Sequence, residues 1–167
     1  TQHAYVRVSE TGGSYEDASS AHFSIIPQPL AGVTWQQKWT GTSKFWSVTS
    51  DGTRWVAVGD SNVSGKAARL MHSLDGKTWT AEDISALGLT GELFEVCHGN
   101  GLFVAVGTGG GIITRPADYS SAWTKQTSGT SAGLGGVAYG NGLYVAVGDG
   151  GVILTSPDAL AWTPRTS

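Results

Sequence analysis

The sequence predicts an all-β protein made of propeller-type blades, each with four antiparallel strands. Two observations support this prediction. A pattern with a constant Val-Ala-Val-Gly run occurs three times, and a series of tryptophans runs in phase with it. The three copies are FWSVTSDGTRWVAVGD (45–60), LFEVCHGNGLFVAVGT (93–108) and LGGVAYGNGLYVAVGD (134–149), which begin 48 and 41 residues apart. A repeat of this length built from short strands is typical of a propeller.

The tryptophan series extends the repeat toward the N-terminus. Each of its members follows an apolar, strand-like run and a polar loop, and the members are Trp35, Trp79, Trp123 and Trp162. Because Trp35 precedes the first Val-Ala-Val-Gly run, this series begins one repeat earlier. We therefore expect three clear blades and a partial or degenerate N-terminal one.

Composition agrees with a turn-rich β protein and excludes several classes of partner. Charged residues make up only 14% of the 167 residues, whereas glycine occurs 25 times and tryptophan seven times. A net charge of −3, with scattered basic residues, gives no electrostatic reason to expect nucleic-acid binding. No apolar run reaches the length of a membrane helix, so membrane insertion is not expected. Cys97, the single cysteine, is expected to be a small buried residue.

Each repeat divides into four predicted strands. The first strand, for example residues 94–98, precedes a dipeptide suited to a two-residue hairpin: Asp51-Gly52, Asn100-Gly101 or Asn141-Gly142. The second strand is the Val-Ala-Val-Gly run, whose consecutive apolar residues predict burial on both faces. Gly-Gly turns then lead to the third strand, and the fourth is expected to begin at the marker tryptophan.

The loop before the marker tryptophan carries a recognisable motif. Residues 73–79 read SLDGKTW, and residues 156–162 read SPDALAW with the same Ser-x-Asp-x3-Trp spacing. This motif resembles the Asp-box of the sialidase-type (BNR-like) propeller repeat, shortened by one residue. The match is poor at residues 115–123, where the loop is longer. The resemblance covers about residues 22–167 and implies structural roles, with aspartates capping turns and tryptophans packing between blades. These roles fall on Ser73, Asp75, Trp79, Ser156, Asp158 and Trp162.

The N-terminal residues leave two organisations open. Residues 1–42 form a degenerate first blade, or residues 1–20 form an arm beside three and a half blades. The corresponding boundaries are 1–20 for the arm or degenerate strands and 21–167 for the repeats, divided at about 21–44, 45–92, 93–133 and 134–167. An unclosed set of blades exposes sheet edges and faces that invite pairing with another chain. A homo-oligomer or larger assembly is therefore expected.

A binding site is expected where the loops vary most. Residues 61–67 form an insertion relative to the last repeat, residues 81–92 form a long link between blades, and residues 127–133 are small and polar. Regular turns occupy the opposite end of each blade, and binding residues concentrate on variable loops. Exposed aromatic rings beside acidic groups suit sugars. The ligand-binding candidates are Trp46, Asp60, Lys66, Glu82, Asp83 and Asp149.

No catalytic or metal site is predicted, and no cofactor is expected. The four histidines lack metal-ligand spacing. The arginines, which a sialidase would need as a triad, do not recur at matching inner positions. Glu82 and Asp83 are adjacent, and adjacent strand residues point to opposite faces, so they do not form a glycosidase couple.

The repeat sequence VAYGNGLYVAVGDGGVILTS (137–156) resembles propeller repeats of bacteriophage tail-fibre and other virion proteins and of bacterial secreted proteins. The resemblance implies a non-catalytic virion or extracellular surface protein whose module attaches to a glycan or cell-surface receptor. The alternative is a purely architectural subunit of a capsid, fibre or filament. A third reading is a glycoside hydrolase of sialidase-like fold.

Overall fold

A computed structural model describes residues 44–60, 68–89 and 91–166 of the chain. These residues belong to one compact unit, Lys38–Ser167. The predictions for the N-terminal arm, for a degenerate first blade and for Lys66 lie outside the described residues.

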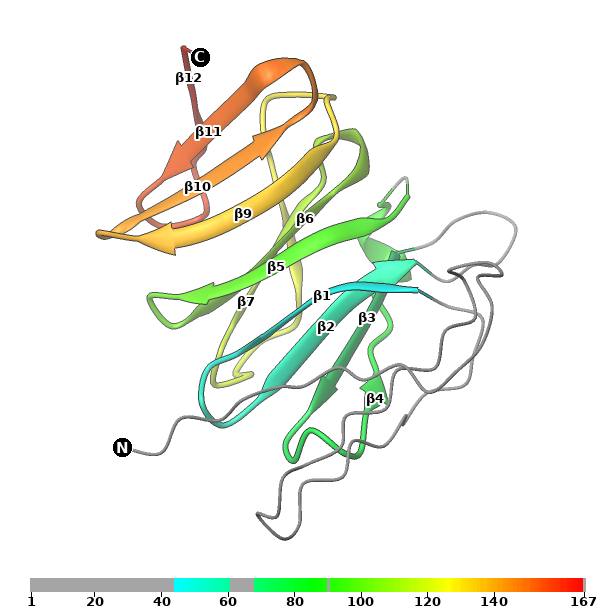
Figure 1. Cartoon of the computed structure of the whole chain (residues 1–167). Coiled ribbons are helices and arrows are strands. Elements are labelled where there is room, and N and C mark those ends of the chain that lie inside the picture. The colour runs from blue at the N-terminus through cyan, green and yellow to red at the C-terminus, as the bar shows by residue number, and fades with distance from the viewer. Residues whose placement is uncertain (1–43, 61–67, 90, 167) are drawn as a thin grey trace, which may run out of the picture. The chain divides into compact units, whose positions relative to one another are not determined.

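Three four-stranded antiparallel sheets follow one another along the chain (Figure 1). Blade 1 contains β1 (Phe45–Ser50), β2 (Trp55–Asp60), β3 (Ala68–Ser73) and β4 (Thr80–Ala81). Blade 2 contains β5 (Leu93–Gly99), β6 (Leu102–Gly107), β7 (Ile112–Pro116) and β8 (Thr124–Gln126). Blade 3 contains β9 (Leu134–Gly140), β10 (Leu143–Gly148), β11 (Val152–Ser156) and β12 (Thr163–Arg165). Short 3-10 turns are η1 (Ser85–Leu87), η2 (Thr108–Gly110) and η3 (Asp149–Gly151). The predicted fold class is confirmed.

Each blade orders its strands as they occur in the sequence, from β1 to β4, from β5 to β8 and from β9 to β12. The first strands β1, β5 and β9 lie side by side from blade to blade (Figure 1). The fourth strand starts one residue after the marker tryptophan in every blade, rather than at it.

Two of the three predicted two-residue hairpins are confirmed. Gly99 pairs with Leu102 across Asn100 and Gly101, whose φ angles are 43° and 74°. Gly140 pairs with Leu143 in the same way. Positive φ at both turn positions matches the right-handed twist of the strands, and asparagine and glycine tolerate it best.

The prediction of a two-residue turn at Asp51-Gly52 is wrong. Ser50 pairs with Trp55, so the loop contains residues 51–54. The Asp51 carboxylate accepts hydrogen bonds from the backbone N–H groups of Thr53 (2.7 Å) and Arg54 (2.6 Å). An aspartate side chain that binds the backbone two and three residues ahead stabilises this wider turn.

The constant glycine of the Val-Ala-Val-Gly run has a steric cause. The segment preceding each first strand crosses over this glycine and accepts a hydrogen bond from the following N–H group, as between Asp60 N and Lys44 O (2.9 Å). A Cβ atom at Gly59, Gly107 or Gly148 would lie 1.8, 2.0 or 2.1 Å from the crossing carbonyl oxygen. Any larger residue would displace that segment.

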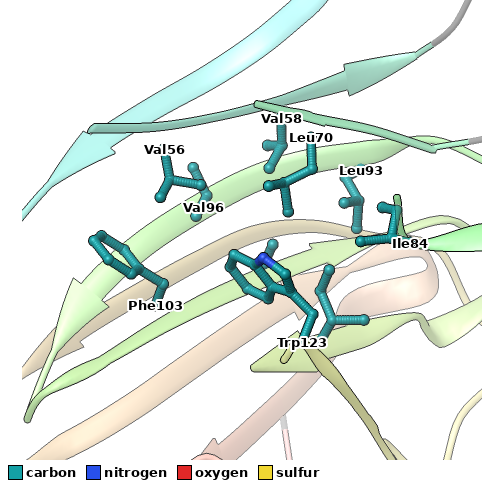
Figure 2. Packing of buried hydrophobic residues seen from close by; sticks show 10 residues of the cluster. Val56, Val58, Leu70, Ile84, Leu93, Val96, Phe103 and Trp123 are labelled. Carbon is teal, nitrogen blue, oxygen red and sulfur yellow. The ribbon is translucent and has the colours of Figure 1, made fainter. Parts of the chain in front are cut away.

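Two apolar cores fill the spaces between consecutive blades. Val56 and Val58 of β2 lie in the first core, together with Phe103 and Ala105 of β6, and Figure 2 shows most of this cluster. The alternate residues of β6, Val104 and Val106, lie in the second core. Both faces of the Val-Ala-Val-Gly strand in blade 2 are therefore buried, as its consecutive apolar residues predict.

The marker tryptophans of blades 2 and 3 contribute to these cores. Trp123 is buried in the first core beside Leu70 and Ile84 (Figure 2). Trp162 is half-buried and packs against the second core, with its ring centroid 6.5 Å from that of Tyr144. Full burial of a large apolar side chain, as for Trp123, contributes about 1.5–3 kcal/mol to folding.

Candidate functional site

The loops of the three blades separate into two ends. Because the strands are antiparallel, the hairpins after the first strands and the loops before the fourth strands lie at one end. Turns η2 and η3, the described residues 82–89 and 91–92 of the first link, and the link 127–133 lie at the other end, which we call the link end. Three cavities open at the link end, with volumes of about 280, 570 and 440 Å³.

The two larger cavities share residues 128–130 as a common wall, and together we call them the link groove. Glycine turns border both, because η2 contributes Gly109 and Gly110 to one cavity and η3 contributes Gly150 and Gly151 to the other. The remaining lining residues come from segments 125–131, 152–154 and 162–165. The groove therefore spans the outer parts of blades 2 and 3.

Hydrogen bonds and a close backbone approach hold the shared wall in place. The Ser128 hydroxyl donates to the Thr130 carbonyl (3.1 Å), and the Ala132 N–H group donates to the Thr130 hydroxyl (3.1 Å). Gly110, at a φ of 71°, packs so closely that an added Cβ would lie 2.0 Å from the Thr130 carbonyl oxygen. The wall is thus fixed to the glycine turn of blade 2.

The groove presents polar groups beside an aromatic ring. Gln126 donates through Nε2 to the hydroxyls of Thr114 (2.8 Å) and Thr124 (3.0 Å). Arg165 donates through Nε to the Thr155 hydroxyl (2.8 Å), which orients its guanidinium. The half-buried Trp162 also lines the groove, and no lining residue of either cavity is acidic. Gln126 lines one cavity, whereas Trp162 and Arg165 line the other, on the two sides of the shared 128–130 wall. A few polar groups beside an apolar ring are typical of a binding site for a polar ligand.

Two of the sequence-predicted candidates, Trp46 and Asp60, lie near the beginning of β1 and the end of β2. The Trp46 ring is exposed, with the Lys44 ammonium 5.7 Å from its centroid. Asp60 is buried, and its carboxylate accepts a hydrogen bond from the Lys44 backbone N–H (3.2 Å). Lys44 therefore joins the two candidates, although the Asp60 carboxylate is turned into the protein.

The other described candidates lie in two separate places. Glu82 and Asp83 line the 280 Å³ cavity beside Ile84, and the exposed Asp83 accepts hydrogen bonds from the Ser85 backbone N–H (3.0 Å) and hydroxyl (2.6 Å). Asp149 is exposed at the start of η3, next to the glycines of the link groove. The five candidates that the structure describes thus do not form one site.

Glu82 belongs to a polar cluster between blades 1 and 2. Its carboxylate accepts hydrogen bonds from the Tyr119 hydroxyl (2.9 Å) and the Trp123 indole N–H (3.1 Å) and pairs with the Arg115 guanidinium. The His72 Nδ1 atom lies 2.7 Å from Oε1. We call these five residues, with Arg54, the Glu82 cluster. Residues of blades 1 and 2 therefore contact the Glu82 carboxylate, and each of its oxygens has protein partners.

Two guanidinium groups enclose the Tyr119 ring within this cluster. The Cζ atoms of Arg54 and Arg115 lie 3.7 and 3.5 Å from the ring centroid, a spacing that places them on opposite faces. Burial, reinforced by the Glu82 charge, raises the pKa of Tyr119. The phenol therefore remains a neutral hydrogen-bond donor to Glu82.

The motif residues of blades 1 and 3 form matching turns. Asp75 accepts hydrogen bonds from the N–H groups of Thr78 and Lys77 (both 2.7 Å) and from the Ser73 hydroxyl (3.0 Å). These donors lower the pKa of Asp75. Asp158 accepts the equivalent hydrogen bonds from the backbone N–H groups of Leu160 (2.9 Å) and Ala161 (3.2 Å) and from the Ser156 hydroxyl (2.9 Å). Trp79, the marker of blade 1, is half-buried.

Cys97 is half-buried beside the second core. Burial raises the pKa of its thiol to about 12, and the Glu95 charge adds to this effect. A thiol that remains protonated is a poor nucleophile. Among the described residues, no group of three or more His, Cys, Asp or Glu could hold a metal ion, and no helix is long and apolar enough to cross a membrane.

Sequence reasoning identified the 127–133 link as variable but did not select individual residues of the link groove. Gln126 and Arg165 are ordinary strand residues in the sequence. The glycines of η2 and η3 appear only as turn formers. The small, polar residues of the 127–133 link were the sequence feature that could have indicated a groove. The groove itself depends on how β12 lies beside that link.

No family model and no curated protein matches this chain. Among solved structures, the chain is similar to YCF48 bound to D1 peptide, with a TM-score of 0.54 and 20% sequence identity over 89% of this chain and 45% of that one. It also matches native Bacillus subtilis arabinanase, with a TM-score of 0.45 and 14% identity over 74% of this chain and 58% of that one. The chain thus spans less than half the length of the YCF48 chain. The first likeness supports a propeller-type fold and nothing finer.

Proposed function

We propose that this chain is a non-catalytic, propeller-type attachment module of a virion or extracellular surface protein, and that it binds cell-surface carbohydrate in the link groove. The observation that carries the proposal is the groove itself. It combines the Trp162 ring, the Gln126 amide and the Arg165 guanidinium with small hydroxyl-bearing residues along one wall. Sugars present apolar ring faces and many hydroxyls, so they match such a lining.

The same geometry argues for binding without hydrolysis. Glycoside hydrolysis uses two carboxyl groups that flank the scissile bond. Neither cavity of the link groove is lined by an acidic residue. Both oxygens of Glu82 already have protein partners, among them Arg115, Tyr119 and Trp123.

A glycan array probed with the full chain tests the proposal. We expect one or more glycans to bind, and we expect Arg165→Ala to weaken a confirmed hit by about tenfold or more in calorimetry, because a hydrogen bond to a charged group is lost. Lys77→Ala is the matched control. It removes one positive charge at the opposite end of blade 1 and should leave affinity unchanged.

A Trp46→Ala variant distinguishes the two candidate locations. The link groove predicts that this variant binds as the wild type does. If Trp46→Ala abolishes binding while Arg165→Ala does not, the ligand is held at β1 and the link groove is the wrong site. An array without any bound glycan overturns carbohydrate attachment altogether.

A further inference from the structure

The repeat gives each blade a front face, which is directed toward the next blade in the sequence. In blades 1 and 2 the β2 and β6 residues of this face are fully buried, as are their partners on β3 and β7. Those residues are Val56, Val58 and Leu70 in blade 1, and Val104, Val106 and Ile112 in blade 2. Both sets lie in the cores between blades.

The front face of blade 3 breaks this rule. The equivalent residues are Val145, Val147 and Ile153, with Val147 paired to Ile153 across β10 and β11. Val147 is 45% exposed, and Val145 and Ile153 are half-buried. The sequence therefore keeps an apolar column in blade 3 that has the composition of an interface between blades and is open to solvent.

A complementary surface is exposed on blade 1. In blades 2 and 3 the opposite, or back, face contains Val96 and Val137, which are buried against the preceding blade. The equivalent residue of blade 1, Val48, is 55% exposed. Trp55 is 43% exposed, whereas its equivalents Phe103 and Tyr144 are fully buried. On the same face, Ala57 of β2 and Met71 of β3 are buried. The exposed part includes Val48 of β1 and Trp55 at the start of β2, and we call it the inner edge of blade 1.

We propose that a second copy of this chain covers the front face of blade 3. The inner edge of blade 1 in one copy, at Val48 and Trp55, packs against Val147 and Ile153 of the next copy. Both interfaces within the chain already pair a front face with a back face, and the contact between copies continues that pairing. Such a head-to-tail contact uses two different surfaces, so it generates rings or open filaments rather than a two-fold dimer. Ile153 lines both this contact and the link groove. The proposal does not depend on the carbohydrate site, because its tests alter Val48 and Val147, and neither residue lines the link groove.

Light scattering coupled to size exclusion, carried out over a series of concentrations, measures this association. We expect the average mass of the wild type to rise above 17.3 kDa as concentration increases. Val147→Asp places a charge in the front face, and Val48→Asp places one in the back face. Each variant is expected to weaken association by about tenfold or more, because a buried, unpaired charge is unfavourable at an interface.

A mixture of the two variants provides the sharpest test. Val48→Asp retains an intact front face and Val147→Asp retains an intact back face, so a head-to-tail contact predicts heterodimers that grow no further. Recovery of association on mixing also shows that both variants are folded. Leu160→Asp is the matched control, since Leu160 is comparably exposed but lies in the loop between β11 and β12. It should assemble as the wild type does.

Three results would overturn the proposal. One is a wild type that remains at 17.3 kDa throughout the series. Another is a Val147→Asp variant that associates as strongly as the wild type. The third is loss of association in Val147→Asp but not in Val48→Asp, which would indicate that two front faces pair with each other.

Discussion

At the scale of single residues, Glu82 joins the first two blades. It follows β4 of blade 1, yet its carboxylate contacts Arg115, Tyr119 and Trp123, all from blade 2. The side chain is about nine-tenths buried. Removing one partner of a buried charged network leaves the others without compensation, which is more damaging than the network is stabilising. If the Glu82 charge is removed, the positive charges of the two arginines that enclose Tyr119 are no longer balanced by it.

Glu82→Gln should therefore destabilise the protein. We expect a loss of about 2–4 kcal/mol in the free energy of unfolding, measured by urea denaturation. The neighbouring Asp83→Asn removes an equal charge from an exposed carboxylate and should change stability by less than about 0.5 kcal/mol. Equal effects of the two substitutions would show that Glu82 contributes nothing beyond its charge.

At the scale of elements, the turns η2 and η3 after the second strands of blades 2 and 3 each contain glycines with positive φ, and these glycines differ in their surroundings. Gly110 and Gly150 both have positive φ, 71° and 69°. An added Cβ at Gly110 would collide with the Thr130 carbonyl, whereas at Gly150 it would meet nothing within 4 Å. Gly110, the second glycine of η2, is therefore required by both packing and conformation, whereas Gly150, the first glycine of η3, is required by conformation alone.

This difference predicts unequal effects of alanine at these two glycines. Gly150→Ala should cost about 1–2 kcal/mol in unfolding free energy, the penalty for a side chain in the left-handed region. Gly110→Ala should cost at least about 1 kcal/mol more, because the 128–130 wall must also move. Thermal unfolding of the two variants measures the comparison, and a smaller effect at Gly110 would contradict the close approach.

At the scale of the described molecule, blade 2 is covered by a neighbour on both faces and blade 3 on one. All four residues 103–106 of β6 are fully buried, whereas β10 has Val147 exposed. Local opening is least favourable where most apolar surface would be uncovered.

Hydrogen exchange should follow this order in dilute solution. The amides of β6 are expected to exchange the most slowly of the second strands, and those of β10 measurably faster, in a mass-spectrometric or NMR experiment. Conditions that promote association should slow exchange at β10 more than at β6. Equal protection of the two strands in the dilute sample would contradict the exposed front face.

The repeat pattern determined most of the fold because its signals are local. Consecutive apolar residues in the Val-Ala-Val-Gly run require burial on both sides, and Asn-Gly dipeptides suit two-residue hairpins. The blade class, the strand order and the positions of the second strands follow from these features. The Asp51 loop departs from the pattern because one carboxylate finds two backbone N–H groups, a competition that its Asp-Gly sequence does not reveal.

Only the tertiary structure decided what the polar residues do. Glu82 was a ligand candidate by its place in a variable link, yet contacts with residues more than 30 positions away tie it between blades. Gln126 and Arg165 line adjoining cavities because β8 and β12 lie on the two sides of the 128–130 wall. Val147 has the same sequence environment as Val58 and Val106, and its exposure depends on whether another blade covers it. Burial and site geometry arise from contacts distant in sequence, which a local repeat cannot encode.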